Sequence, residues 1–356
     1  MEAVVAEVRA RAVIAPLAQP LRTASGTIPA APLVLIDVAT DQGGAGRAYV
    51  FGYTPLMLRP LVATIENLAP MLVGKPVAPV DRMADFTAAF RLLGRQGLLG
   101  MVLSGIDMAL WDALARERGT SVCRLLGASE RPLPAYASFG AIDLSSDLGR
   151  IEAALRQGFA AIKVKIGGGT LAQDLATVSA VRAAIGPETG LMVDYNQSLT
   201  MPEAVRRIRA LAGFDLVWVE EPVPAEDLKG HAAVRGAGCA IKTGENWWFP
   251  EDVARAVALG ASDFAMFDLM KIGGVTGWMR AAGQAEGASL PVSSHLFVEA
   301  SAHVLAATAT AHFLEHLDLA GAILRDPVPV VSGCVQPRGP GLGLDWDEAA
   351  VARYAA

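Results

Sequence analysis

Three acidic residues, Asp194, Glu220 and Glu245, stand at nearly even spacing in this sequence, each at the end of a short apolar run. If the runs are neighbouring strands of one sheet, the three carboxylates lie side by side. They would repel one another unless a cation joined them, and oxygen ligands without cysteine or paired histidine favour Mg2+. We therefore predict a magnesium site, in which Mn2+ can substitute, with ion pairs to nearby lysines as the alternative.

Two lysines, Lys163 and Lys165, stand two positions apart in a run whose other residues are apolar. In a strand both side chains would point to the same face, here the interior of the fold. Two ammonium groups at such range are expected to depress each other's pKa and move one lysine toward neutrality, where it can act as a base. Lys165, nearer the end of the run, is predicted to be that base.

Asp268 and His295 end two consecutive apolar runs, and Glu315 ends the next. A carboxylate at Asp268 could hold the imidazole by one nitrogen and leave the other free as a second base. Glu315, kept protonated by its neighbours, could donate a hydrogen bond to an anionic substrate. The alternatives are a core histidine with satisfied hydrogen bonds and an ordinary loop carboxylate. No His-x-His or His-Glu-x-x-His pattern supports zinc.

Two bases with a metal between them predict the removal of a proton from one face of a carbon and its return to the other. Deprotonation next to a carboxylate creates an enediolate with an additional negative charge. Mg2+, Lys163 and Glu315 could stabilise that charge in a dry cavity. The predicted chemistry is metal-assisted 1,1-proton transfer, for which a symmetric pair of bases makes racemisation natural.

These residues belong to a series of eight β-branched or apolar runs between residues 131 and 319, separated by helical or loop segments. This alternation predicts an α/β fold, a modified (β/α)8 barrel of the TIM type, in which the strand ends converge on one mouth. A polar residue at the end of any one strand could have a purely structural role, such as capping a helix. Eight successive strands that all end in polar residues are hard to assign to chance. The polar residues that end the runs are Ser138, Lys163 with Lys165, Asp194 with Asn196, Glu220 with Glu221, Glu245 with Asn246, Asp268, His295 and Glu315.

Residues 1–130 are predicted to form a separate α+β capping domain. The first 50 residues alternate apolar and polar side chains, with a turn at Gly43 and Gly44, as in an antiparallel meander. Residues 16–32 are rich in Pro, Gly, Ser and Thr and are expected to form an irregular lid loop. From Thr54 to about Gly119 the apolar spacing is helical. Residues 320–356 are expected to be an irregular C-terminal segment that packs back on the capping domain.

The composition excludes several classes of partner. Of 356 residues, 36 are acidic and 30 basic, which gives a formal charge of -6 without any Lys/Arg-rich block for nucleic acid. Charged or polar residues interrupt every apolar run before the ~18 residues needed to span a membrane. The N-terminal residues do not resemble a secretory signal, and the three cysteines form no Cys-x-x-Cys pair. A cytoplasmic enzyme that acts on a small-molecule carboxylate is expected.

Motifs on the successive predicted strands resemble those of the mandelate racemase subgroup of the enolase superfamily, over essentially the whole chain. The motifs are KVK, MVDYNQSL, WVEEP, TGENW, DLMKIGGVTGW, SSHLF and HFLEHLDLAG. The resemblance implies an enolase-like fold with an N-terminal capping domain. It also implies racemisation of an aromatic 2-hydroxy acid such as mandelate, by two bases and through an enediolate.

The resemblance further implies a role for each matching residue. In these roles Asp194, Glu220 and Glu245 bind Mg2+, Lys165 serves the S enantiomer, and His295 paired with Asp268 serves the R enantiomer. Glu315 acts as the electrophilic acid at the substrate carboxylate, Lys163 and Ser138 contact that carboxylate, and Asn196 lies near the α-hydroxyl. Leu21 and Ile28 of the lid resemble a hydrophobic cap over an aryl group, and Tyr53 resembles a residue that helps to close it.

Some residues depart from the pattern of the subgroup. Ala137 and Phe139 flank Ser138, where the subgroup has Asp and His, and Arg22 in the lid leaves room for a more polar ligand. The nearest alternative is an acid-sugar dehydratase of the same superfamily, in which the enolate expels a β-hydroxyl. A lysine in place of Asp268 would indicate a muconate cycloisomerase or a dipeptide epimerase. A barrel that only binds a carboxylate ligand is a further alternative.

Other features are less informative. The KIGGVTG segment at 271–277 matches no phosphate-binding motif and is predicted to be a tight turn. Trp247 and Trp248 either line the pocket or pack beneath it. The resemblance implies a homo-oligomer, from dimer to octamer.

Overall fold

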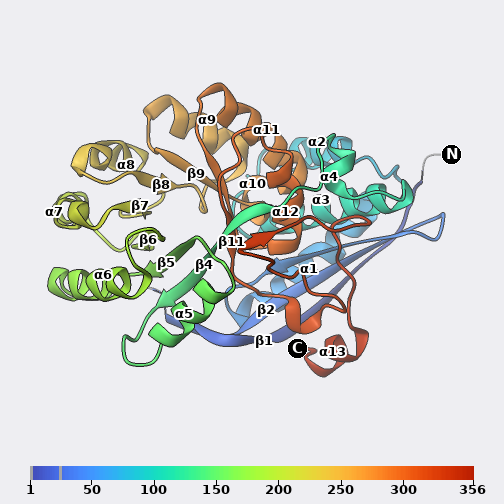
Figure 1. Ribbon diagram of the computed structural model, residues 1–356. Helices are drawn as coiled ribbons and strands as arrows, with labels where there is room; N and C mark the ends of the chain where they lie inside the picture. Colours follow the sequence, from blue (N-terminus) through green and yellow to red (C-terminus); the bar gives the residue numbers. More distant parts are fainter. Residues whose placement is uncertain (1–2, 24–25) are drawn as a thin grey trace.

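The computed structural model describes residues 3–23 and 26–356 of the chain. An antiparallel sheet near the N-terminus lies beside a nearly closed barrel of eight parallel strands, as Figure 1 shows. The predicted fold class, a modified (β/α)8 barrel with an N-terminal capping domain, is confirmed.

The N-terminal sheet has the strand order β1-β2-β3, and both pairs are antiparallel. Its strands are β1 (Val5–Thr23), β2 (Gly26–Thr40) and β3 (Ala45–Phe51). The helical segments that follow are η1 (Pro55–Met57), α1 (Leu58–Leu68), η2 (Ala69–Met71), α2 (Pro79–Ala89), α3 (Leu98–Glu117) and α4 (Val122–Leu125).

Residues 16–32 are not the irregular lid loop that their composition predicts. In the structure residues 16–23 belong to β1 and residues 26–32 to β2, which pair as a long antiparallel hairpin, while residues 24–25 lie outside the described part of the chain. The register shifts between Pro16 and Leu21, and Pro20 lies inside this irregular stretch. Prolines are tolerated at such an irregularity because a bulged residue need not donate to the ladder.

Helix α3 packs directly against the N-terminal sheet. Gly46 and Gly105 permit this approach, because a Cβ on Gly46 would lie 2.5 Å from the Ala113 nitrogen and one on Gly105 would lie 2.6 Å from Ile36 Cδ1. By length and composition α3 could cross a membrane, but 72% of its apolar window is buried in the fold. A core helix of a globular protein has the same properties.

The barrel strands are hydrogen-bonded in the order β10-β9-β8-β7-β6-β5-β4-β11. Each of the eight predicted runs forms one strand: β4 (Leu133–Ala141), β5 (Ala161–Lys165), β6 (Gly190–Asp194), β7 (Leu216–Glu220), β8 (Ile241–Thr243), β9 (Phe264–Asp268), β10 (Val292–His295) and β11 (Leu314–His316). A parallel bridge between Val292 and Ala311 brings the two ends of the sheet together.

Helices between the strands surround the barrel (Figure 1). They are α5 (Leu148–Arg156), α6 (Leu171–Ile185), α7 (Met201–Leu211), η3 (Ala212–Phe214), α8 (Leu228–Val234), η4 (Arg235–Ala237), α9 (Phe249–Leu259), α10 (Leu269–Ile272), α11 (Gly274–Gly287) and α12 (Val298–Ala306). Strand alternation directs Ile162 and Val164 of β5 toward the helices and Lys163 into the barrel, and all three side chains are buried.

After β11 the chain does not form a full-length eighth barrel helix. It continues through η5 (Gly321–Ile323), β12 (Cys334–Val335), which pairs with β4, and α13 (Glu348–Arg353). This segment contacts the N-terminal sheet: Trp346 Nε1 donates to Asp37 Oδ1 at 2.8 Å, and Arg11 pairs with Glu348 at 2.6 Å. The barrel and the N-terminal sheet are therefore tied together by the end of the chain.

Candidate active site

The polar strand ends meet at one mouth of the barrel because the strands are parallel and in register. Lys165 pairs in register with Asp194, Asp194 with Glu220, and His295 with Asp268. Each of these residues is the last of its strand. The hydrogen bonding of the sheet alone thus sets the order of charges around the mouth.

Asp194, Glu220 and Glu245 form a buried carboxylate cluster in which one oxygen of each lies within 4.8 Å of the others. Two of the three carboxylates also form ion pairs with lysine: Glu220 with Lys163 at 2.5 Å, and Asp194 with Lys165. The ion pairs that were the alternative to a metal site are therefore partly present. Glu245 Oε2 lies 3.3 Å from His295 Nε2 but makes no hydrogen bond. Buried, closely spaced oxygens, one of them unsatisfied, fit a divalent cation such as Mg2+.

Other groups fix the directions of these carboxylates. Trp218 Nε1 donates to Glu220 Oε2 at 3.0 Å, and Asn196 Nδ2 donates to Asp194 Oδ2 at 2.9 Å. Burial raises the pKa of Glu220 to about 7, against the opposing charge of Lys163. Burial would also raise the pKa of Glu245, but the charges of His295 and the lysines lower it to about 2.

The predicted depression of the Lys165 pKa is wrong in this arrangement. Burial is the largest influence and lowers the pKa of Lys165, but the charges of Asp194 and Glu245 and the hydrogen bond to Asp194 together more than offset it, and the net shift is upward. Lys163 lowers the pKa of Lys165 as expected, although by less than Asp194 raises it. The carboxylate that each lysine contacts therefore outweighs the repulsion between the lysines.

His295 and Asp268 form the expected pair, with 2.6 Å between Nδ1 and Asp268 Oδ2. The other Asp268 oxygen accepts from the backbone nitrogens of Met270 and Lys271 at the start of α10, so the carboxylate cannot rotate freely. Burial alone would lower the pKa of His295, but Glu245 and nearby carboxylates raise it to about 9. Nε2 remains directed at the carboxylates of the mouth.

Glu315 is not held protonated by its neighbours, as the sequence analysis expected. Burial would raise its pKa, but Lys163, whose Nζ lies 2.9 Å away, and His295 lower it well below the usual range. Leu296 N donates to Glu315 Oε2 at 3.0 Å, and a side-chain hydrogen bond joins Ser138 to Glu315. In this arrangement Glu315 is an ionised acceptor.

A cavity of about 680 Å3 lies between the hairpin and the barrel mouth. On the hairpin side it is lined by Leu21 and Ile28, with Phe51 and Tyr53 from the end of β3 and the loop after it. Its barrel side includes Lys165, Asn196, Glu245, Asn246, Lys271 and His295. The predicted apolar cap and the predicted bases thus face one cavity.

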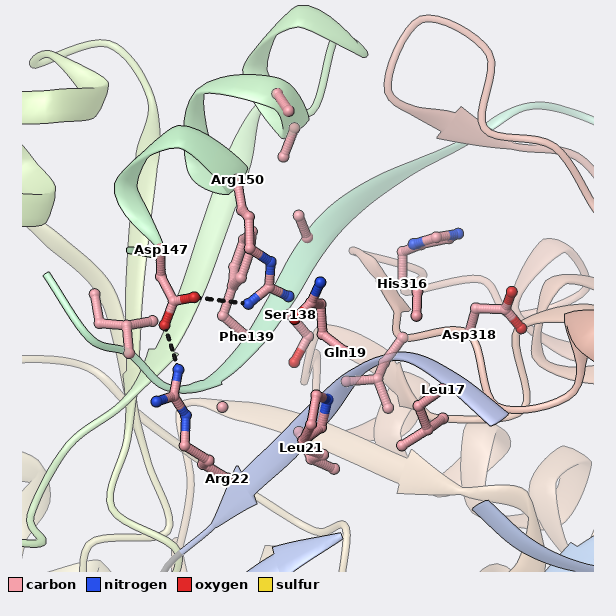
Figure 2. Close-up of a pocket in the computed structure, with 18 of the residues that line it drawn as sticks. Leu17, Gln19, Leu21, Arg22, Ser138, Phe139, Asp147, Arg150, His316 and Asp318 are labelled. Carbon is pink, nitrogen blue, oxygen red and sulfur yellow. Dashed lines mark hydrogen bonds and ion pairs between the residues drawn. The ribbon is translucent and has the colours of Figure 1, made fainter. Parts of the chain in front are cut away.

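Ser138, Ala137 and Phe139 line a second cavity, of about 370 Å3, rather than the first. It lies between β1 and the barrel where β4, α5 and the segment after β11 meet, and Leu21 lines both cavities. Figure 2 shows Arg22 and Arg150 reaching Asp147 from opposite sides, at 2.5 and 2.9 Å. Phe139, which departs from the pattern of the subgroup, therefore belongs to this second cavity and not to the main one.

Lys271 was not predicted as a site residue, although its buried side chain lines the larger cavity. Residues 271–277 are not the predicted tight turn: Lys271 lies in α10, Gly273 at positive φ separates α10 from α11, and Gly274, also at positive φ, begins α11. The available signal was its position three residues after Asp268. Trp247 is buried and packs near Phe267, while Trp248 contacts the backbone around Gly100, so neither lines either cavity.

The chain is similar to known proteins over its whole length. Residues 5–127 match the N-terminal domain model of mandelate racemase / muconate lactonizing enzyme, and residues 149–350 match the enolase C-terminal domain-like model. The 3,6-anhydro-alpha-L-galactonate cycloisomerase of Streptomyces coelicolor is 32% identical over 91% of this chain and 91% of its own.

Solved structures of similar proteins share the fold. An enolase from Bradyrhizobium, complexed with magnesium and mandelic acid, is 55% identical, with a TM-score of 0.98 and coverage of 100% of this chain and 99% of its own. L-Talarate dehydratase from Polaromonas sp. JS666, complexed with Mg and L-glucarate, is 28% identical, with a TM-score of 0.91 and coverage of 99% and 98%. The relatives therefore include proteins named for acid-sugar chemistry, among them a cycloisomerase, a class that the sequence did not predict.

Proposed function

The chain belongs to the mandelate racemase and muconate lactonizing enzyme family of enolase-like proteins, and we propose that it is an isomerase that moves the α-proton of a 2-hydroxy carboxylate with Mg2+. One observation carries the proposal. Lys165 at the end of β5 and His295 at the end of β10 line the same cavity, and the strands β6 to β9 with the carboxylate cluster lie between them in the sheet. Two proton-transfer groups on opposite sides of a metal site favour racemisation.

The proposed substrate is an aromatic 2-hydroxy acid such as mandelate. Its aryl group would face the apolar hairpin side of the cavity, formed by Leu21, Ile28 and Phe51. The magnesium and mandelic acid bound to the Bradyrhizobium enolase, at 55% identity, support this assignment.

In the proposed mechanism, Asp194, Glu220 and Glu245 would hold Mg2+, which when bound would supply positive charge to offset the negative charge that develops on the deprotonated substrate. His295 exchanges a proton with the R enantiomer at Nε2, because Asp268 occupies Nδ1. Lys165 exchanges a proton with the S enantiomer at Nζ.

Three further residues orient the substrate in this proposal. Lys163, buried between Glu220 and Glu315, brings positive charge toward the substrate carboxylate. Glu315 contacts the same carboxylate region and acts as the electrophilic acid only if substrate and metal raise its pKa from the low value that Lys163 imposes. Ser138 would hold Glu315, and Asn196, beside Asp194, would lie near the α-hydroxyl.

A second candidate function is acid-sugar dehydration, in which the same enediolate expels a β-hydroxyl. The names of the Streptomyces and Polaromonas relatives favour acid-sugar chemistry. Lys271 in the main cavity and Arg22 in the neighbouring smaller cavity also offer cationic groups that an aryl ring does not need. Both candidates share the metal site and the first proton transfer, so they differ only in the fate of the intermediate.

The test is proton NMR of (R)- and (S)-mandelate, incubated separately with the Mg2+-loaded enzyme in D2O, with optical rotation followed in parallel. Loss of the α-proton signal from both enantiomers together with decay of rotation supports the racemase. Absence of exchange, with a keto-deoxy product from a panel of sugar acids, would replace it with the dehydratase. Mg2+ binding without turnover of either class indicates a barrel that only binds carboxylates. Samples with EDTA in excess over Mg2+ are the control.

A further inference from the structure

Lys271 is a buried cation that the proposed proton transfers do not use. Only 7% of its surface is exposed, and its Nζ donates to Asn246 Oδ1 at 2.5 Å. A second hydrogen bond joins it to the Tyr53 hydroxyl, and Nζ lies 5.3 Å from the centre of the Tyr53 ring. Both hydrogen-bond partners are neutral, and the charges of Asp268 and Glu245 help to offset the cost of burying the ammonium group. Lys271 is therefore part of the charge balance of the mouth.

Lys271 determines which way the Asn246 amide points. An ammonium group is a donor without acceptor capacity, so Asn246 can present only its oxygen to Lys271. The Nδ2 group must then face the other way, where it donates to Glu221 Oε2 at 2.7 Å and to Glu245 Oε1 at 3.3 Å. Lys271 thus keeps the Asn246 Nδ2 group directed at the carboxylates of Glu221 and Glu245.

Both carboxylates that Asn246 contacts are part of the metal site or adjacent to it in sequence. Glu245 is itself a member of the cluster, and Glu221 directly follows Glu220. Glu221 has φ +35°, a left-handed conformation that costs energy for a residue other than glycine and persists only where the surroundings enforce it. The hydrogen bond from Asn246 is one of the contacts that hold Glu221 there, at the point where the chain leaves β7.

The same chain of contacts reaches the capping domain through Tyr53. Tyr53 follows β3, adopts φ +58°, and its ring lies 4.6 Å from that of Phe51. We propose that Lys271 is a positioning residue that links Tyr53 of the capping domain to Asn246, and through Asn246 orients Glu221 and Glu245 for Mg2+. The inference rests on the proposed function only in its identification of the metal ligands.

The test measures Mg2+ binding to metal-stripped protein by isothermal titration calorimetry, without substrate. Lys271→Met is expected to raise the Kd for Mg2+ about tenfold, because loss of a group that orients a metal ligand typically weakens affinity by 10- to 100-fold. Lys271→Arg, which keeps the charge and the donors, is expected to restore much of the affinity. Lys229→Met, which removes an exposed lysine of α8, is the matched control and should leave the Kd unchanged.

A double-mutant cycle tests the route through Asn246. If Lys271 acts through the amide, Lys271→Met combined with Asn246→Ala binds Mg2+ no more weakly than Asn246→Ala alone. Additive losses of Mg2+ affinity would overturn the route through Asn246. An unchanged Kd in a folded Lys271→Met variant would overturn the proposal, whatever happens to its melting temperature.

If Lys271→Met does not fold, the comparison of Lys271→Arg with Asn246→Ala tests the proposal, which requires Asn246→Ala to weaken Mg2+ binding more than Lys271→Arg does. Because no turnover is measured, an inactive enzyme that binds Mg2+ normally would contradict the proposed function and not this inference.

Discussion

The two walls of the main cavity are built on different principles. The barrel wall carries buried ionisable groups at the ends of parallel strands, and strand register fixes their order, as in the pairs of Lys165 with Asp194 and Asp194 with Glu220. The hairpin wall carries apolar groups such as Leu21 and Ile28 on a strand pair whose register shifts. The barrel wall therefore supplies the chemistry, while the hairpin wall can select a substrate without disturbing it.

The hairpin is nevertheless anchored to the barrel at one place. A Cβ on Gly140 of β4 would lie 2.7 Å from the Arg22 nitrogen and closer still to its carbonyl oxygen, so the two backbones are in direct contact. Arg22 then pairs with Asp147, a contact visible in Figure 2. Changes on the barrel wall should affect chemistry, and changes at this anchor should affect binding.

The largest expected effect belongs to the barrel wall. His295→Asn removes the proton-transfer group at Nε2, and general acid-base catalysis typically contributes 10^2- to 10^4-fold. We expect exchange of the α-proton of (R)-mandelate to fall at least about a hundredfold, with exchange of (S)-mandelate retained through Lys165. NMR in D2O measures both rates. Lys165→Met should show the reverse preference, and equal losses for both enantiomers in each variant would contradict a two-base mechanism.

The difference between the walls also explains what the sequence could predict. The residues of the barrel wall were identified because each ends a short apolar run, and parallel strands bring such ends together whatever the helices between them do. Their protonation was not predictable, because the pKa of Lys165 depends on its contact with Asp194 and not on the spacing to Lys163. Lys271 was missed because the glycines after it indicated a turn, whereas Gly273 lies between two helices and Gly274 begins the second.

The hairpin was predicted poorly for a related reason. Pro16 and Pro20 argue locally against a strand, but a long-range contact at Arg22 holds the backbone against β4. Such tertiary contacts override local composition and leave no periodic signal. The separate cavity beside Phe139 was likewise invisible in the sequence, since it depends on where the chain goes after β11.

The second prediction breaks the anchor of the hairpin. Gly140→Ala places a methyl group against the Arg22 backbone, and overpacking of this kind costs about 1–3 kcal/mol. We expect the KM for substrate to rise more than kcat falls, because the hairpin wall moves while the barrel wall does not. Gly149→Ala on α5 is the matched control, since no heavy atom lies within 4 Å of the added methyl group. A fall in kcat with constant KM would show that the walls are not independent.

The third prediction concerns pH and the packing of the N-terminal sheet on the barrel. Glu299 of α12 accepts a hydrogen bond from the Tyr49 hydroxyl of β3 at 2.8 Å, and burial, with a contribution from Asp318, raises its pKa to about 7. The folded protein therefore holds this proton more tightly than the unfolded chain, and stability falls as pH rises from about 4.5 to about 7. Glu299→Gln should remove that loss, so the variant gains about 3 kcal/mol relative to wild type across this interval, because one pKa unit corresponds to about 1.4 kcal/mol. Urea unfolding at several pH values measures the difference, and a constant difference would contradict the raised pKa.

The smallest effect is expected at Arg22. Its side chain is 43% exposed, so the ion pair with Asp147 contributes about 0–1 kcal/mol. Asp147 also keeps its contacts with Arg150 and the Asp143 nitrogen, which means that Arg22→Met leaves no buried charge unpaired. We expect a rise of at most about threefold in the KM for mandelate, with kcat unchanged. Arg124→Met removes an ion pair with Glu130 whose residues line neither cavity, and should change neither constant. A much larger rise with an acid-sugar substrate than with mandelate would mean that Arg22 contacts substrate, and would favour the dehydratase over the racemase.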